Sequence, residues 1–327
     1  MGLFDYHQVE FPGLGWEFTI TRGFTIGGFK IYWYAIIIAC GLMLAVIYAL
    51  RNAKGFRLNS DNMMDVALVT IPFAFIGARL YYVLFSGNLS QYTANPASIL
   101  NIRDGGLGIY GGIIVAFIVG PLVCKFRKVN ILSMFDVASM GFLIGQSVGR
   151  WGNFFNQEAF GGNTTLPWGM TGDIIRSGRN GSSYVYDLPV HPTFLYESLW
   201  CLLGFVLLHL WFKKAYKFKG QIFCGYIVWY GLGRFCIESL RTDSLMIGSM
   251  PISQLVAALA VIGGSILFLM LRRHAIALPR TLEIAPEDDL QLEAYDGEEA
   301  DVSDTADEEE NTDAEDAVED DAAEEEE

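Results

Sequence analysis

The chain has 327 residues, of which 52% are hydrophobic and 14% aromatic, and its mean hydropathy is +0.32. This composition excludes an ordinary soluble globular domain and is typical of a protein that has the lipid bilayer as its solvent. The net charge of −15 hides two opposite regions: residues 281–327 hold 24 Asp and Glu and no Lys or Arg, whereas residues 1–280 hold 22 basic against 13 acidic residues, a net +9.

Seven apolar stretches are long enough to cross about 30 Å of hydrocarbon as helices. They cover residues 31–50, 63–86, 108–124, 131–149, 192–212, 221–240 and 251–271. The third is short and is preceded by glycines, so it is compatible with a re-entrant or tilted segment. We therefore predict an all-α polytopic membrane protein of about seven transmembrane helices, with its membrane domain at residues 31–272.

The basic residues between these stretches predict the orientation, because Lys and Arg accumulate in short cytoplasmic loops. Most of them fall in one alternating set of loops, at 51–57, 125–128, 213–219 and 272–280. This places the N-terminal segment 1–30 outside and the C-terminus in the cytoplasm. The Gly-, Asn- and Ser-rich loop at 150–191 is then a small extracytoplasmic cap.

Residues 273–327 are predicted to be a disordered acidic cytoplasmic tail. They are so charged and so poor in large apolar side chains that they cannot bury enough surface to offset the entropy of ordering. The composition identifies no partner for the tail.

Arginines at bilayer depth are functional candidates, because a charge there costs about 3 kcal/mol or more unless it is paired or hydrated. Arg79, in the second stretch, and Arg150, at the end of the fourth, both lie toward the predicted outer face. Each also has a simpler interpretation, as a snorkelling side chain or an interfacial anchor. With Arg234 they make three guanidiniums on one leaflet. Such a set suits a phosphate, because Arg offers forked donors and keeps its charge.

The sixth stretch carries a polar stripe toward its predicted outer end. Tyr230, Arg234, Glu238 and Arg241 follow one another at helical spacing and therefore share one face. The same spacing is equally compatible with an internal ion-pair network that holds the bundle together.

Two further motifs need separate interpretations. His191, at the start of the fifth stretch, is either a functional group or only a cap or hydrogen-bonding residue. The run Gly105–Gly112 literally contains GxGxxG, but no strand precedes it, so we reject a dinucleotide site. Gly141, Gly145 and Gly149 repeat every four residues, which predicts close contact with another helix.

At the end of the fourth stretch, the segment Gly149–Gly161 reads GRWGNFFNQEAFG. It resembles, position by position, the signature of the prolipoprotein diacylglyceryl transferase family. The segment HPTFLYES at 191–198, the stripe at 230–241 and the glycine run at 105–112 are similar to further family motifs, in the same order. The resemblance covers residues 30–271 and leaves the acidic tail outside.

The resemblance implies a seven-helix enzyme of the bacterial cytoplasmic membrane that acts in the first step of lipoprotein maturation. It would transfer the diacylglyceryl group of phosphatidylglycerol to the lipobox cysteine of a prolipoprotein signal peptide, form a thioether and release glycerol 1-phosphate. The implied partners are these two substrates and membrane lipids, with no cofactor, metal, nucleotide or nucleic acid. The five cysteines agree, since they show no CxxC pair and no neighbouring His at ligand spacing.

The resemblance also implies roles for individual residues. Arg150 and Arg234 match the important arginines of the family, and we expect them to clamp the phosphate. The positions expected to hold the headgroup and orient these arginines are Asn153, Glu158, Gly161, Tyr34 and Tyr230, with Arg79 as a further cation.

One position departs from the family pattern. Many members have His before the Gly-Gly pair of the glycine run, and this chain has Tyr110. A tyrosine, with a reference pKa near 10, is a poor base at neutral pH. Tyr110 is therefore expected to bind the headgroup or take part in catalysis, and the general base is left as His191, Glu158 or no protein group.

Three other functions are weighed against this one. A channel or transporter for an anionic solute needs polar residues along the whole depth of several helices, whereas here ionisable groups cluster toward the outer leaflet. Another lipid-headgroup transferase usually needs a metal-binding Asp cluster, but Asp65 and Asp136 are isolated near the inner face. A purely structural membrane protein is disfavoured by the density of Arg and Asn at the outer face.

Overall fold

The computed structural model describes residues 5–87, 89–101, 105–177, 188–242, 246–248 and 250–275. Residues 276–327, which hold nearly all of the predicted acidic tail, lie outside the described residues. The tail's predicted disorder therefore stays a prediction.

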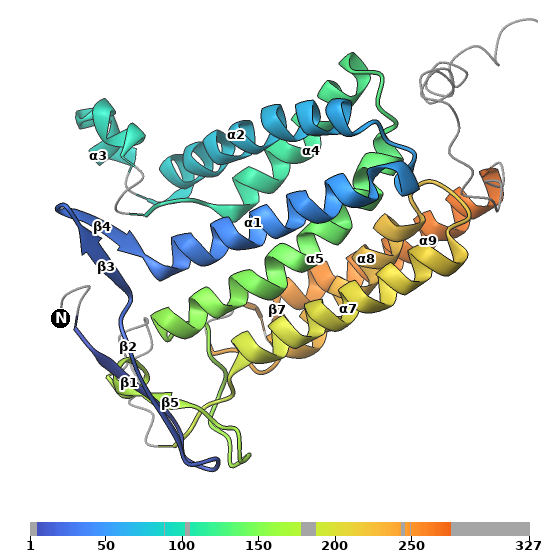
Figure 1. Ribbon diagram of the computed structural model, residues 1–327. Helices are drawn as coiled ribbons and strands as arrows, with labels where there is room; N and C mark the ends of the chain where they lie inside the picture. Colours follow the sequence, from blue (N-terminus) through green and yellow to red (C-terminus); the bar gives the residue numbers. More distant parts are fainter. Residues whose placement is uncertain are drawn as a thin grey trace, which may run out of the picture.

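Long helices that run side by side dominate the described structure (Figure 1). They are α1 (Trp33–Asn52), α2 (Ser60–Phe85), α4 (Ile109–Phe126), α5 (Ile131–Asn156), α7 (Thr193–Ala215), α8 (Gln221–Glu238) and α9 (Ile252–His274). Each coincides with one predicted stretch. By length and composition, six of them are apolar enough to cross a membrane, and α8 is not among these. Its polar side chains, notably Gln221, Arg234 and Glu238, lower its hydropathy. The predicted polytopic helical membrane protein is confirmed.

Short elements gather at one end of the bundle, which we call the cap end (Figure 1). The strands β1 (His7–Phe11), β2 (Trp16–Ile20) and β5 (Thr171–Gly172) form an antiparallel sheet in the order β2-β1-β5. A hairpin of β3 (Gly23–Ile26) and β4 (Phe29–Tyr32) leads directly into α1. The other short elements at this end are α3 (Leu89–Ala94), η2 (Pro96–Leu100), α6 (Asp173–Arg176), β6 (Met246–Ile247) and β7 (Met250–Pro251), whereas η1 (Ala53–Phe56) follows α1 at the opposite end. The N-terminal segment and the 150–191 loop, predicted without strands, thus share one sheet.

Glycines allow the closest helix contacts. Gly41 of α1 faces Gly145 of α5, and a Cβ at Gly41 would lie 3.4 Å from the Gly145 Cα. The contact predicted for the repeated glycines of α5 is therefore found, with α1 as the partner. α2 pairs along its length with α4, and this pair meets the rest of the bundle chiefly near the end opposite the cap, where the Phe117 ring lies 5.5 Å from the Phe135 ring.

The opposite end, which we call the far end, holds the main apolar core and a buried carboxylate. Asp136 of α5 is fully buried and accepts hydrogen bonds from the Tyr216 hydroxyl (2.6 Å) and from the backbone N–H groups of Gly220 and Phe223 (both 2.7 Å). It therefore fixes the first turn of α8 against α5. Asp65, the other isolated acid, pairs with Arg127.

Candidate functional site

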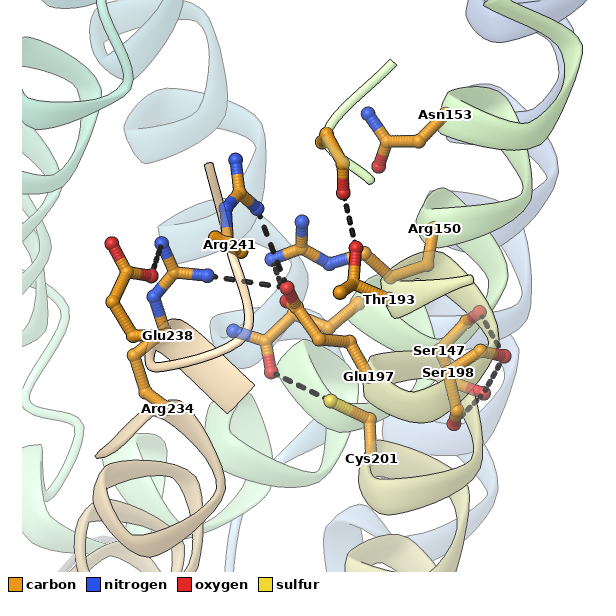
Figure 2. A network of polar contacts seen from close by, with 12 residues as sticks. Ser147, Arg150, Asn153, Thr193, Glu197, Ser198, Cys201, Arg234, Glu238 and Arg241 are labelled. Carbon is orange, nitrogen blue, oxygen red and sulfur yellow. Dashed lines mark hydrogen bonds and ion pairs between the residues drawn. The ribbon is translucent and has the colours of Figure 1, made fainter. Parts of the chain in front are cut away.

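A single carboxylate, Glu197 of α7, lies at the centre of an ion network near the cap end (Figure 2). One of its oxygens, Oε2, pairs with Arg150 of α5. The other, Oε1, accepts from Arg234 Nη1 at 3.2 Å and from Arg241 Nη1 at 3.5 Å. Arg234 also pairs through Nη2 with Glu238 at 2.6 Å. Three guanidiniums thus share two carboxylates among the contacts of the described residues.

The network is buried on its acidic side and partly open on its basic side. The Glu197 and Glu238 side chains are 6% and 2% exposed, whereas Arg150 and Arg234 keep 22% and 20% of their surface. The carboxylates are therefore enclosed, whereas part of the Arg150 and Arg234 side chains stays exposed. Such an arrangement can receive an anion without first breaking the internal pairs.

A small crevice opens beside this network. It is lined by Glu197, Trp200, Cys201, Tyr230, Gly233, Arg234 and Ile237. The charges of Arg150, Arg234 and Glu197 all act on the Tyr230 hydroxyl. Tyr230 and Arg234 of the predicted α8 stripe therefore line the crevice, and Arg234, Glu238 and Arg241 take part in the internal ion-pair network.

Side chains one turn beyond Arg150 form a second polar group. Asn153 and Asn156 both donate through Nδ2 to Glu158 Oε1, at 3.1 and 3.0 Å. The Tyr34 ring of α1 packs against Gly152, where any side chain would collide with it. The charges of Glu158 and Arg150 both act on the Tyr34 hydroxyl. Three of the predicted headgroup residues, Tyr34, Asn153 and Glu158, are thus brought together beside Arg150.

Gly161 joins three segments of the chain. Its N–H donates to the His191 carbonyl at 2.9 Å, and the next N–H, of Gly162, donates to the Leu240 carbonyl at 2.8 Å. A Cβ at Gly161 would lie 2.7 Å from the Leu240 oxygen and 2.8 Å from the His191 Cβ. Glycine is therefore required for packing here, and the close approach holds Arg241 near α7.

His191 lies in a separate chain of hydrogen bonds. Its Nδ1 is 3.2 Å from the Tyr196 hydroxyl, which accepts from Trp168 Nε1 at 2.8 Å. The Tyr196 hydroxyl hydrogen is thus available to His191. The next helical residue, Thr193, donates to the Ala159 carbonyl (Figure 2). These bonds tie the start of α7 to the signature segment that follows α5.

Arg79 also lies toward the cap end, but none of its contacts in the described part of the chain joins it to the Glu197 network. Its buried guanidinium donates to the carbonyls of Ser98 (2.9 Å), Ile99 (2.8 Å), Gly105 (3.1 Å) and Gly106 (2.8 Å). These carbonyls lie before α4, so Arg79 closes the connection between α3 and α4. Each of its three guanidinium nitrogens donates to at least one backbone carbonyl.

Tyr110 lies on the same α2–α4 pair. It is 57% exposed in the first turn of α4, and its ring is 6.2 Å from that of Tyr81. None of the contacts found in the described part of the chain joins it to Glu197 or to the arginines around it.

Glu197, the central residue of the network, is not among the site residues that the sequence predicts. The signal was present, since Glu197 is an acid within the apolar stretch 192–212 and meets the same criterion that selected the arginines. For Arg241 the sequence predicts only a position at the end of the polar stripe of the sixth apolar stretch. Both become evident once α5, α7 and α8 are packed together.

Comparison with known proteins gives one consistent result. Residues 22–270 match the family model described as prolipoprotein diacylglyceryl transferase. The chain is 43% identical over 243 residues to the phosphatidylglycerol–prolipoprotein diacylglyceryl transferase of Clostridioides difficile (strain 630), covering 74% of this chain and 92% of the relative. It is 44% identical over 246 residues to the same-named protein of Clostridium novyi (strain NT), covering 75% and 93%. The chain therefore belongs to the prolipoprotein diacylglyceryl transferase family.

Proposed function

We propose that this chain transfers the diacylglyceryl group of phosphatidylglycerol to the lipobox cysteine of a prolipoprotein signal peptide. Family membership and the names of the relatives support the reaction. The observation that carries the proposal is the Glu197 network. It presents two partly exposed arginine side chains, Arg150 and Arg234, near the cap end of the bundle.

The reaction is a substitution at the glycerol carbon that bears the phosphate. The cysteine sulfur forms a bond to this carbon, the carbon–oxygen bond to phosphate breaks, and glycerol 1-phosphate leaves. The thiol proton goes to a base, and negative charge grows on the departing phosphate. Arg150 and Arg234 would stabilise that charge most strongly in the transition state, when it is largest.

The neighbouring polar group suits the glycerol end of the lipid. Asn153 and Glu158 carry an amide and a carboxylate that can bind hydroxyl groups, and Tyr34 adds a phenol on the same side. Tyr230 lines the crevice and is influenced by the charges of Arg150, Arg234 and Glu197, so it would help to orient the two arginines. Gly161 acts indirectly, by permitting the packing that places Arg241.

Two groups in the α5–α7 connection are our candidates for accepting the thiol proton. Glu158 is already held by two amide donors, and His191 is bonded to Tyr196. Tyr110 contacts Tyr81 of the α2–α4 pair, and we assign it at most a contact with the headgroup.

We also propose an orientation in a bacterial cytoplasmic membrane. The far end carries the basic residues at the ends of α1, α4, α7 and α9, so it would face the cytoplasm. The cap, with the N-terminus, would then lie outside. Labelling of single cysteines introduced in the β1–β2 turn and after α4 tests this, because only the former should react with an impermeant reagent in intact cells.

The proposed reaction is tested with purified protein in detergent, phosphatidylglycerol and a lipobox peptide. We expect release of glycerol 1-phosphate and a peptide mass increased by the diacylglyceryl group, and neither product with a peptide that has serine in place of cysteine. A folded wild-type protein that releases none would contradict the proposal, and anion uptake into liposomes would be measured next. Deletion of residues 281–327 is expected to leave the activity unchanged.

A further inference from the structure

Two tryptophans clasp α7 and α8 together just below the ion network. The rings of Trp200 and Trp229 are stacked, with centroids 4.3 Å apart and planes at 15°. Trp200 Nε1 donates to the Trp229 carbonyl, and Trp229 Nε1 donates to the Trp200 carbonyl, both at 3.0 Å. Each indole is therefore bonded to the backbone of the other's residue, and the pair is reciprocal.

Two glycines make this arrangement possible. Gly204 of α7 lies against the Trp229 indole nitrogen, and Gly233 of α8 lies against that of Trp200, so a Cβ at either position would collide with the ring. A shift of either helix by one residue, about 1.5 Å along its axis, would bring a side chain onto the ring. The pair therefore permits one register of α7 against α8.

This tryptophan pair, which we call the clasp, lies close to Glu197 and Arg234, whose ion pair depends on the register of α7 against α8. Trp200 is three residues after Glu197 and lines the same crevice, together with Arg234. On the other side of α7, Ser147 of α5 and Ser198 form a second reciprocal pair, in which each Oγ donates to the other's carbonyl at 3.0 and 2.8 Å (Figure 2). Glu197 is thus held between two helices that are each locked to α7.

We propose that Trp200 and Trp229 are positioning residues that set the register in which Glu197 holds Arg234 toward the lipid phosphate. The long side chains of the ion pairs can meet in several registers, so they do not fix one themselves. In a membrane, close packing and interhelical hydrogen bonds decide how helices associate. A misplacement of about 1 Å can lower a rate by about 100-fold. This inference rests on the proposed function.

The first test is kinetic and compares Trp200→Phe and Trp229→Phe with Trp211→Phe. Phenylalanine keeps a ring but removes the indole N–H. Trp211 is a matched control, because it packs on Gly225 of α8 and on Phe268 of α9, away from the network. We expect either clasp variant to lower kcat about tenfold, with KM for phosphatidylglycerol within about twofold, and Trp211→Phe to change neither by more than about twofold. Equal losses in all three variants would overturn the proposal.

The second test asks whether the clasp acts through Glu197. We expect the combined Trp200→Phe, Glu197→Gln variant to lose much less activity than the product of the two single losses, and the shifts in melting temperature to be non-additive in the same way. Independent activity losses and additive temperature shifts would overturn the proposal, since sites without coupling add. A wild type without transfer activity would refute the proposed function, and the melting-temperature cycle alone would then decide whether the clasp is coupled to Glu197. Trp229→Phe serves in the same cycle if Trp200→Phe does not fold.

Discussion

The protein holds arginine near the cap end in two different ways. On the α2–α4 pair, Arg79 gives its guanidinium to four backbone carbonyls and is 8% exposed. In the α5–α7–α8 group, Arg150 and Arg234 share the Glu197 carboxylate and keep about a fifth of their surface exposed. Both sets of arginines lie near the cap end, yet the second set keeps a larger part of its side chains exposed.

The difference shows that depth in the membrane does not by itself identify a binding arginine. Backbone carbonyls accept from every nitrogen of the Arg79 guanidinium, so a ligand there would have to compete with the connection to α4. A shared carboxylate fixes a guanidinium from one side only. The hydrogen-bond partners of an intramembrane arginine, more than its position, therefore indicate whether it is placed to bind a ligand or to stabilise the fold.

The largest expected effect is on the arginines of the network. Arg150→Ala or Arg234→Ala should lower kcat/KM at least about 100-fold, because each removes charge that stabilises the departing phosphate. Release of glycerol 1-phosphate measures this. Arg176→Ala is the control, since Arg176 is an exposed cap arginine paired with Glu10, and its loss should cost less than about twofold. Equal losses of activity at all three positions would show that the network arginines contribute no more than an exposed arginine of the cap.

Glu197→Gln should have the next largest effect. The substitution keeps the shape but leaves Arg150, Arg234 and Arg241 with one carboxylate fewer. Breaking a buried ion network in this way typically costs about 3–5 kcal/mol. We expect a lower melting temperature and a loss of activity of roughly 10- to 100-fold, smaller than for the arginines because both guanidiniums remain. Wild-type values for both quantities would show that Glu197 does not hold the site.

Arg79→Met should affect stability more than chemistry. It removes four hydrogen bonds made by a charged donor, a kind of bond worth about 1.5–3 kcal/mol each and less where it is partly exposed. We expect a clear fall in melting temperature, with the activity of the folded fraction within about threefold of wild type. A loss of transfer activity above 100-fold at an unchanged melting temperature would show that Arg79 acts in the binding site, and would contradict the structural role inferred for it.

Tyr110→Phe should have the smallest effect. Its side chain is largely exposed and belongs to the α2–α4 pair, so removal of the hydroxyl should change kcat and KM by less than about threefold. Steady-state kinetics on the purified variant provide the measurement. A tenfold or greater fall in kcat would instead show that the α2–α4 pair contributes a catalytic group.

Apolar length predicted the helices well, because a bilayer imposes it on every spanning helix. The cap sheet was not predictable in the same way. β1 is five residues long, and its partner β5 has two residues and lies about 160 positions later, so no local pattern joins them. In the bundle the sequence predicted which residues were charged but not which would meet. Spacing alone indicates Arg234 with Glu238, four residues apart on one helix, whereas Arg150 with Glu197 depends on how α5 packs against α7.

The carboxylate of Asp136 has a consequence for how the protein is made. Its donors are supplied by Tyr216, Gly220 and Phe223, which follow it in the chain by 80, 84 and 87 residues. At a typical synthesis rate of about 5–20 residues per second, Asp136 therefore precedes the first of these donors by roughly 4–16 s. During that interval the ribosome has delivered a helix whose acid has none of its three final donors. The Asp136 hydrogen bonds at the far end can therefore form only after α7 and the start of α8 have been synthesised. The order of translation thus sets the order in which this end assembles.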